Sequence, residues 1–324
     1  MPTRVLITGV TGFVGSHLAE YCLDKGCLVF GSGRRRSPLT NIQSLLPNKR
    51  FKLMEMELDD SLSISSALKT ARPDLIFHLA AQSYVPASFE SPHYTLKTNI
   101  LGTLTLLESL RQWSRGGSTR LQIAGSSEEY GLVYEHECPI VETQALRPLS
   151  PYGVSKVACD LLAAQYARSY GMQVVRTRAF NHEGARRGRE FVTSNFAYQA
   201  VLVAAGKKSE LKVGNLDAVR DFSHVKDIIH GYWLALEKGE SGEVYNICSG
   251  KATKISQVID ILSGLLGREL PFSLDRARLR PSDVPYLVGD CSKFRKQTGW
   301  EPHLTFDDAM KDLVAYWREH LGLS

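Results

Sequence analysis

The sequence of 324 residues predicts an α/β fold, in which a doubly wound parallel sheet with helices on both faces is joined to a smaller mixed α/β lobe. Three observations lead to this prediction. Short apolar runs alternate with segments of helical period through the first half of the chain, glycines mark the first strand-to-helix junction, and the alternation loosens beyond about residue 180. We therefore expect a first domain over residues 1–180 and a lobe over residues 181–324, with crossings of the chain back to the first domain.

The predicted strands are short, apolar and rich in β-branched residues. In the first domain they cover residues 4–8, 28–32, 51–56, 74–80, 121–126 and 172–180, and in the lobe residues 211–215 and 243–248. Apolar residues recur every three or four positions in the segments expected to be helices, which are 13–26, 61–70, 255–267, 306–321 and one that begins near Ser150. Strands that alternate with helices in this way are typical of βαβ units, whose strands run parallel.

Composition and charge exclude several classes of protein. The chain carries 39 Lys and Arg against 34 Asp and Glu, but its basic residues are scattered apart from "GRRRS" and "GARRGR", so we expect local anion sites and no nucleic-acid partner. The six cysteines have no metal-ligand spacing, which predicts no metal site and favours a reducing cytoplasm. No apolar run approaches the roughly 20 residues of a membrane span, so no membrane association is expected.

Glycines at the first strand-to-helix junction predict a dinucleotide site. Gly9, Gly12 and Gly15 have the spacing GxxGxxG, between the strand at 4–8 and the helix that follows. Glycines there permit a tight turn and let the backbone approach a pyrophosphate, whose charge the helix N-terminus stabilises. Because the triad opens a βαβ series, we interpret the first domain as a Rossmann-like dinucleotide-binding domain. The alternative is that the three glycines serve only the turn.

The end of the second strand favours NADP over NAD. An NAD-binding protein usually carries an acid there against the ribose 2′-hydroxyl, whereas this chain has "GSGRRRS". The forked donors of Arg34 and Arg35 suit the oxygens of a 2′-phosphate. The alternative is that this basic loop is only solvated.

A tyrosine and a lysine four residues apart suggest acid–base chemistry. Tyr152 and Lys156 in "SPYGVSK" lie on one face of the expected helix. An ammonium group beside a phenol favours the phenolate, so we expect Lys156 to lower the pKa of Tyr152 from about 10 toward neutrality. Together with the glycine turn and the hydroxyl-bearing "GSS" segment, this spacing indicates an enzyme.

With these motifs the chain resembles the extended short-chain dehydrogenase/reductase family, in its nucleotide-sugar branch. The resemblance rests on "GVTGFVGSHLAE", "SSEEYG", "SPYGVSK", "FNHEGARRGREFVT", "VGNLDAVRDFSHVKD" and "RLRPSDV". Within the branch it is similar to GDP-mannose 4,6-dehydratases and nearly as similar to GDP-4-keto-6-deoxy-mannose reductases. The resemblance implies NADP-dependent 4,6-dehydration of a GDP-hexose. The alternatives are an NADPH-dependent reductase of a GDP-4-keto-6-deoxy sugar and a non-catalytic dinucleotide sensor.

The resemblance also assigns residues to the site. It implies that the catalytic residues are Ser126, Glu128, Tyr152 and Lys156. The dinucleotide is expected to contact Gly9, Gly12, Phe13, Val14, Gly15, Arg34, Arg35, Leu58, Leu79, Ala80, Ala81, Tyr152, Lys156 and His182. The GDP-sugar is expected to contact Ser83, Ser127, Asn181, Val192, Arg220, Arg280 and Asp283. Ser126 stands where the dehydratases carry threonine, and Asp283 where they carry glutamate.

The two acids of "SSEEYG" are expected to differ. If the strand continues to this point, Ser126 and Glu128 share one face and Glu129 lies on the other. Glu129 is then a solvated charge or a helix-capping partner, and Glu128 is the base that removes the sugar C5 proton. The arginines of "ARRGR", Arg186, Arg187 and Arg189, either line the substrate pocket, reach a neighbouring subunit's cofactor, or are solvated. Relatives pair through the helices expected near 96–113 and 151–170, so we expect a homodimer or homotetramer.

Overall fold

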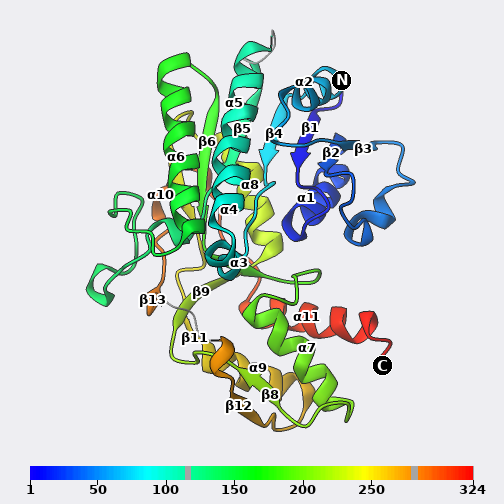
Figure 1. Cartoon of the computed structure of the whole chain (residues 1–324), viewed down its shortest axis with the longest axis vertical. Coiled ribbons are helices and arrows are strands. Elements are labelled where there is room, and N and C mark those ends of the chain that lie inside the picture. Colours follow the sequence, from blue (N-terminus) through cyan, green and yellow to red (C-terminus); the bar gives the residue numbers. More distant parts are fainter. Residues whose placement is uncertain (114–117, 279–283, 324) are drawn as a thin grey trace.

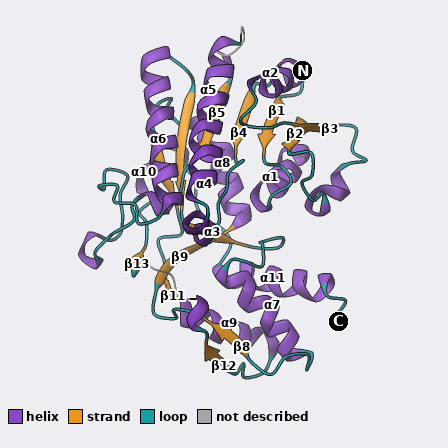
Figure 2. Ribbon diagram, viewed as in Figure 1, coloured by secondary structure: helices purple, strands orange, loops and turns teal. Residues whose placement is uncertain are grey.

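A seven-stranded parallel sheet forms the centre of the larger part of the molecule (Figures 1 and 2). The computed structural model describes residues 1–113, 118–278 and 284–323 and confirms the predicted fold class. The strand order is β10-β6-β5-β4-β1-β2-β3, and every neighbouring pair is parallel. The strands are β1 (Arg4–Thr8), β2 (Leu28–Gly33), β3 (Phe51–Glu55), β4 (Leu75–His78), β5 (Arg120–Ala124), β6 (Val174–Ala179) and β10 (Val244–Ile247).

Helices cover both faces of this sheet. On one face, α1 (Phe13–Asp24), α8 (Val225–Lys238) and α10 (Ser292–Thr298) bury their apolar residues with one side of the strands. On the other face lie α2 (Ser61–Ala71), α5 (Gly102–Gln112) and α6 (Pro151–Tyr170). Short elements before α5 are α3 (Val85–Glu90), α4 (Pro92–Leu96) and a π-helical turn, η2 (Lys97–Leu101). The doubly wound arrangement places the carboxyl ends of the parallel strands at one edge, where such folds bind ligands.

A smaller lobe lies below that edge in Figure 1. Its core is formed by α7 (Val192–Ala204), α9 (Ile255–Leu266) and α11 (Phe306–His320). Two small sheets accompany these helices and contain β7 (Asn181–Glu183), β8 (Leu211–Val213), β9 (Val219–His224), β11 (Ala252–Lys254), β12 (Phe272–Leu274) and β13 (Tyr286–Leu287). The chain returns from the lobe to the large sheet through α8, β10 and α10, so the last strand of that sheet comes from residues beyond 180.

Short 3₁₀ turns complete the described chain. They are η1 (Thr40–Leu45), η4 (Ser127–Glu129), η5 (Glu135–Glu137) and η6 (Arg276–Arg278). Within the residues that the structure describes, no helix has the length and apolar character needed to span a membrane. Likewise, the described His, Cys, Asp and Glu side chains form no group suited to holding a metal ion, and all six cysteines are unpaired.

Candidate active site

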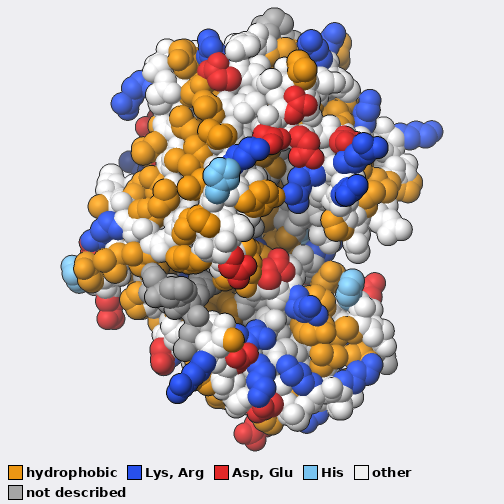
Figure 3. Space-filling view, in the orientation of Figure 1, with side chains coloured by type: hydrophobic (Ala, Val, Ile, Leu, Met, Phe, Trp, Pro, Cys, Tyr) orange, Lys and Arg blue, Asp and Glu red, His pale blue; other side chains and the backbone are white. Residues whose placement is uncertain are grey.

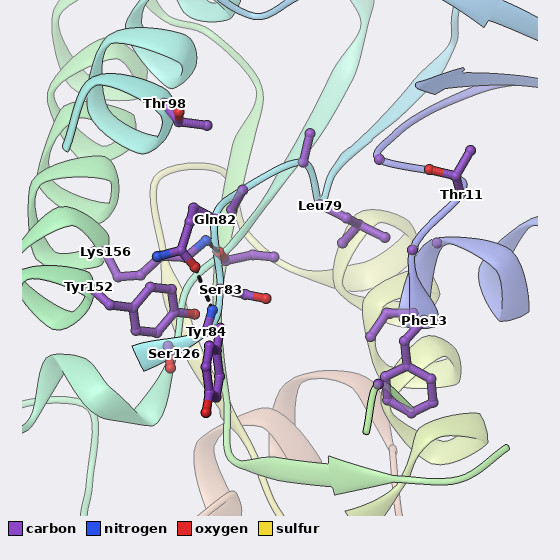
Figure 4. Close-up of a pocket in the computed structure, with 18 of the residues that line it drawn as sticks. Thr11, Phe13, Leu79, Gln82, Ser83, Tyr84, Thr98, Ser126, Tyr152 and Lys156 are labelled. Carbon is purple, nitrogen blue, oxygen red and sulfur yellow. Dashed lines mark hydrogen bonds between the residues drawn. The ribbon is translucent and has the colours of Figure 1, made fainter. Parts of the chain in front are cut away.

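A cavity of about 870 Å³ opens at the carboxyl ends of the parallel strands, and it brings together most of the predicted site residues (Figure 4). The predicted residues that line it are Gly9, Gly12, Phe13, Val14, Gly15, Arg34, Leu58, Leu79, Ala80, Ala81, Ser83, Ser126, Ser127, Glu128, Tyr152, Lys156, Asn181, His182 and Val192. In the described part of the chain, Arg35 and Arg220 do not line it. Arg280 and Asp283 lie outside the described residues.

The glycine turn leaves room for a ligand's phosphates at the start of α1. Gly9 has a φ of +71°, and a Cβ on Gly15 would lie 2.4 Å from the Gly9 carbonyl oxygen, so both positions require glycine. Helix α1 begins at Phe13 with Gly12 as its N-cap, and no side chain caps it. Its first turn carries no acidic residue, so its free N–H groups and dipole face the cavity unopposed. These features fit the pyrophosphate of a dinucleotide.

The wall beyond β2 is basic where an acid would favour NAD. Arg34 lines the cavity directly after the strand, and its Nη1 donates a hydrogen bond of 2.9 Å to the Tyr94 hydroxyl. Ser37 and Asn41 line the same wall. A 2′-phosphate beside Arg34 would therefore meet a guanidinium group and polar side chains.

Helix α6 positions the tyrosine and the lysine. The Ser150 hydroxyl caps this helix by accepting a hydrogen bond of 3.0 Å from the Gly153 N–H, and Pro151 occupies the first turn. One turn apart, Tyr152 and Lys156 are both buried, and the Lys156 ammonium lies 5.9 Å from the centroid of the Tyr152 ring. Lys156 also donates a hydrogen bond of 2.7 Å to the Ala124 carbonyl oxygen at the end of β5.

Lys156 lowers the pKa of Tyr152, as predicted, but the net shift of this pKa is upward and not toward neutrality. Burial of the phenol raises the pKa of Tyr152 above its usual value of 10, and this effect is larger than the opposing effect of Lys156. The Ser126 hydroxyl, which hydrogen-bonds the phenol, also lowers this pKa. Lys156 and Ser126 therefore favour the phenolate but do not outweigh its desolvation.

A 3₁₀ turn, and not a strand, carries the two acids of "SSEEYG". Strand β5 ends at Ala124, two residues earlier than predicted, and η4 covers Ser127–Glu129. The alternation argument therefore does not apply at this point, although Ser126 and Glu128 do line the cavity together, and Ser127, a predicted substrate contact, lines it as well. The Ser126 hydroxyl caps the turn by accepting a hydrogen bond of 3.2 Å from the Glu128 N–H.

Glu129 lies in the interior of the protein and not in solvent. Its side chain is fully buried, and its Oε1 accepts a hydrogen bond of 2.7 Å from the Ser126 N–H. The interpretation of Glu129 as a solvated charge is wrong, and the alternative, a capping partner, is what the structure contains, because Ser126 and Glu129 form a capping box. Its Oε2 lies 2.9 Å from the Nε of Arg178. No local pattern in the sequence indicates this pair, because its members are 49 positions apart.

Asn99 supports the wall of the cavity, a role that is not predicted from the sequence. It lies in the π-helical turn η2 and is buried. Its side chain accepts a hydrogen bond of 2.8 Å from the Gln82 N–H and donates bonds of 3.0 Å to the Gln82 carbonyl and 2.9 Å to the Ser155 hydroxyl. Asn99 therefore fixes the cavity wall around Gln82 against helix α6. The available signal is that Asn99 lies at helical spacing from the buried residues Thr103 and Leu106.

The arginines of "ARRGR" fold onto their own chain. Arg186, in a left-handed conformation with a φ of +71°, donates a hydrogen bond of 2.6 Å to Glu20 on α1. The guanidinium of Arg187 lies 3.5 Å from the ring centroid of Phe191, and both Arg186 and Arg187 line the cavity. Arg189 lies over the ring of Tyr198. The interpretation of this loop as merely solvated is wrong for Arg186 and Arg187.

The structure also locates two other predicted ligand contacts, His182 for the cofactor and Arg220 for the substrate. His182 stacks on Phe13 in the cavity, and burial, followed by the charge of Arg187, lowers the pKa of His182 to about 4, so its ring is neutral at pH 7. Arg220 is buried in β9, where its Nη1 donates a hydrogen bond of 2.6 Å to the Val284 carbonyl oxygen, directly after the segment that contains Arg280 and Asp283.

Comparisons with known proteins show which proteins the whole chain resembles. The family model for GDP-mannose 4,6 dehydratase matches residues 6–313. The chain is 35% identical to a GDP-mannose 4,6-dehydratase of Vibrio cholerae serotype O1, covering 96% of this chain and 92% of that protein. It is also 35% identical to a GDP-6-deoxy-D-mannose reductase of Pseudomonas aeruginosa, covering 99% of both.

Solved structures give the same picture. The structure of RMD from Pseudomonas aeruginosa complexed with NADPH has a TM-score of 0.82 and 32% identity, covering 98% of this chain and 100% of that one. A UDP-glucose 4-epimerase from Thermotoga maritima with UDP-glucose has a TM-score of 0.87 and 28% identity, covering 98% of this chain and 99% of that one. The large sheet and the lobe therefore occur together in proteins that bind dinucleotides or nucleotide sugars.

Proposed function

Because the chain belongs to the GDP-mannose 4,6-dehydratase family of nucleotide-sugar enzymes, within the extended short-chain dehydrogenases/reductases, we propose that it converts GDP-mannose to GDP-4-keto-6-deoxy-mannose with NADP as a recycled cofactor. One observation carries the choice of dehydration. Glu128 lines the cavity together with Ser126 and Tyr152, so a carboxylate is available beside the hydroxyl and phenol that would hold the sugar 4-oxygen.

The cofactor proposal rests on the two ends of the cavity. The glycine turn and the open N-terminus of α1 suit the pyrophosphate, and Arg34 suits a 2′-phosphate. Bound there, NADP would accept a hydride from C4 of the sugar and later return one to C6. Stacked on Phe13, the neutral ring of His182 adds no competing charge to this part of the cavity.

The chain's own residues would carry the proton transfers. Tyr152 removes the proton of the sugar 4-hydroxyl as C4 is oxidised, and Ser126 holds the 4-oxygen in line with the phenol. The resulting 4-ketone acidifies the neighbouring C5–H, and Glu128 removes that proton. Glu128 would then pass this proton to the 6-hydroxyl, which leaves as water, and the proton taken up by Tyr152 balances the one that C5 finally regains. A positioned acid or base of this kind contributes about 10² to 10⁴ in rate.

The sugar nucleotide would extend from this point toward the lobe. Ser83, Ser127, Asn181 and Val192 line the cavity on that side, where hydroxyl and amide groups suit sugar hydroxyls and phosphate oxygens. We assign the diphosphate to Arg220 and Arg280 and the nucleoside to Asp283, on the basis of the resemblance. Guanidinium groups bind phosphate oxygens in a bidentate manner.

An NADPH-dependent reductase of a GDP-4-keto-6-deoxy sugar is the second candidate. The observation that favours it is the end-to-end match to the Pseudomonas aeruginosa reductase, which covers 99% of both chains, compared with 92% of the Vibrio cholerae dehydratase. Such an enzyme would use Tyr152 and Lys156 as proton donors to the 4-oxygen and would have no use for Glu128 as a base.

The test is incubation of the purified protein with GDP-mannose and no added cofactor. We expect the 4-keto-6-deoxy product, and we expect Glu128→Gln to lose this activity by about 100-fold or more. Glu190→Gln is the matched control, since Glu190 lines the same cavity. No product, together with NADPH oxidation on supplied keto sugar, would establish the reductase instead. Full activity of Tyr152→Phe would refute the assigned chemistry, and inactivity of the wild type in both assays would favour a dinucleotide sensor.

We also propose that the chain pairs with a second copy through α4 to α6. Apolar side chains gather over these helices in Figure 3. Between them, α4, η2 and α6 carry five apolar side chains that are about half exposed: Tyr94, Leu101, Val154, Leu161 and Tyr170. A contiguous apolar surface of this kind is typical of an interface between subunits.

The unpaired cysteines suit a reducing cytoplasm as the compartment in which the protein works.

A further inference from the structure

Three buried charges and one partly buried charge lie behind the candidate active site. The side chains of Glu129, Asp160 and Arg178 are at most 4% exposed, and none of the three lines the cavity. Arg178 lies between the two acids, with its Nε 2.9 Å from Glu129 Oε2 and its Nη2 2.8 Å from Asp160 Oδ2. Arg176 approaches the same Asp160 oxygen at 2.9 Å, so the four formal charges sum to zero. Buried ions are costly unless they are paired, and each acid of this cluster lies within 2.9 Å of a guanidinium nitrogen.

One end of this cluster closes the turn that carries the predicted catalytic residues. Glu129 Oε1 accepts the Ser126 N–H at 2.7 Å, and the Glu129 N–H donates to the Ser126 carbonyl at 3.1 Å. The carboxylate approaches the chain so closely that a Cβ on Gly125 would lie 2.4 Å from Oε1. Ser126 and Glu128 are therefore held at the cavity by a group that does not itself reach it.

The other end of the cluster is fixed to helix α6. Asp160 lies one turn beyond Lys156 on this helix, which also carries Tyr152. Arg178, on β6, also stacks on Tyr130 and donates a hydrogen bond of 3.1 Å to the Glu142 carbonyl, so it cannot follow either acid without losing contacts. Arg178 therefore connects the turn and the helix, which supply the two halves of the catalytic set.

We propose that Glu129, acting through Arg178 and Asp160, is a positioning residue that fixes Ser126 and Glu128 relative to Tyr152 and Lys156. The proposal rests on the catalytic roles assigned above, and it adds a requirement that those roles do not contain. Displacement of a catalytic group by about 1 Å can cost on the order of 10²-fold in rate, even when the substituted residue is remote from the chemistry. Loss of this network should therefore lower kcat and leave ligand binding nearly unchanged.

Two arginines on the same strand give a matched comparison. Arg178→Met and Arg176→Met each remove a guanidinium group from Asp160, but only Arg178 contacts Glu129. We expect Arg178→Met to lower kcat by about tenfold to a hundredfold, with KM for the nucleotide sugar and Kd for NADP changed by less than about threefold. Arg176→Met should keep kcat within about threefold of the wild type. Equal losses of kcat in the two variants would overturn the proposal.

A double variant separates positioning from folding. Replacing both members of a buried ion pair by apolar residues is often neutral for stability, so Glu129→Leu with Arg178→Met should fold while lacking the acceptor for the Ser126 N–H. We expect kcat to remain low in this variant at a wild-type melting temperature. Wild-type kcat would overturn the proposal. A crystal structure of the double variant in which Ser126 has not moved would also overturn the proposal. This readout does not depend on activity, so it still applies if the wild type is inactive on both proposed substrates. Such inactivity would refute the proposed function separately.

Discussion

A buried histidine under the dinucleotide end of the cavity should make folding sensitive to mild acid. His78 ends β4, with its Nδ1 2.9 Å from the Thr8 hydroxyl and its Nε2 3.1 Å from the Thr103 hydroxyl. The Thr8 hydroxyl already accepts hydrogen bonds from the N–H groups of Leu79 and Ala80, so its own proton is donated to Nδ1. The His78 ring is therefore neutral and carries its proton on Nε2. A second proton on Nδ1 would face the hydroxyl proton of Thr8.

The sign and size of the effect follow from the pKa. Burial, and secondarily the charge of Lys156, lowers the pKa of His78 from 6.5 to about 3. Below pH 6.5 the unfolded chain therefore binds a proton that the folded chain does not, and the free energy of unfolding falls. The neutral His78 ring makes its full contribution to the free energy of unfolding above pH 6.5, and this contribution is lost as the pH falls toward 3. At about 1.4 kcal/mol per pH unit, the loss between pH 6.5 and 5.0 is about 2 kcal/mol.

Urea unfolding of wild type and His78→Gln at pH 7.5, 6.5, 5.5 and 5.0 tests this reasoning. Glutamine keeps a donor and an acceptor but cannot titrate. We expect the variant to lose less unfolding free energy than the wild type on acidification, with the difference between them changing by about 2 kcal/mol between pH 6.5 and 5.0. His136→Gln controls for the loss of a histidine from an exposed site. A difference between wild type and His78→Gln that stays constant with pH would refute the assigned burial of a neutral ring.

Three further predictions concern the cofactor and the assembly. Arg34→Ala should weaken NADP binding by about tenfold or more and leave NAD binding nearly unchanged, as measured by fluorescence titration, because only NADP carries the 2′-phosphate. Gly15→Ala should destabilise the fold by about 1–3 kcal/mol in urea unfolding and abolish NADP binding, since the added Cβ would lie 2.4 Å from the Gly9 carbonyl oxygen. Leu161→Asp should convert the proposed dimer to a monomer in light scattering, and an unchanged mass would exclude α6 from the interface.

The parts of the site that follow from local spacing could be predicted from the sequence. The glycine turn follows from residues within one strand-to-helix junction, and the helix that carries Tyr152 and Lys156 begins at a serine cap and a proline, all within seven positions. The pairing of Glu129 with Arg178 could not be predicted in this way, because it depends on the approach of β6 to the end of β5. The net shift in the pKa of Tyr152 could not be predicted for a related reason, since spacing indicates the neighbouring Lys156 but not the burial of the phenol.

The turn at the end of β5 explains why the adjacent acids, Glu128 and Glu129, lie in such different environments. Pleat alternation does not decide the matter, because the strand has already ended at Ala124. The capping box draws the Glu129 carboxylate back to the Ser126 N–H and into contact with Arg178, away from the cavity. Successive side chains of a 3₁₀ turn point in different directions, so Glu128 does not follow Glu129 and lines the cavity. Because Glu129 is buried and Glu128 is at the cavity, we expect both carboxylates to be needed, Glu128 for the proposed proton transfer and Glu129 for the proposed positioning of the turn.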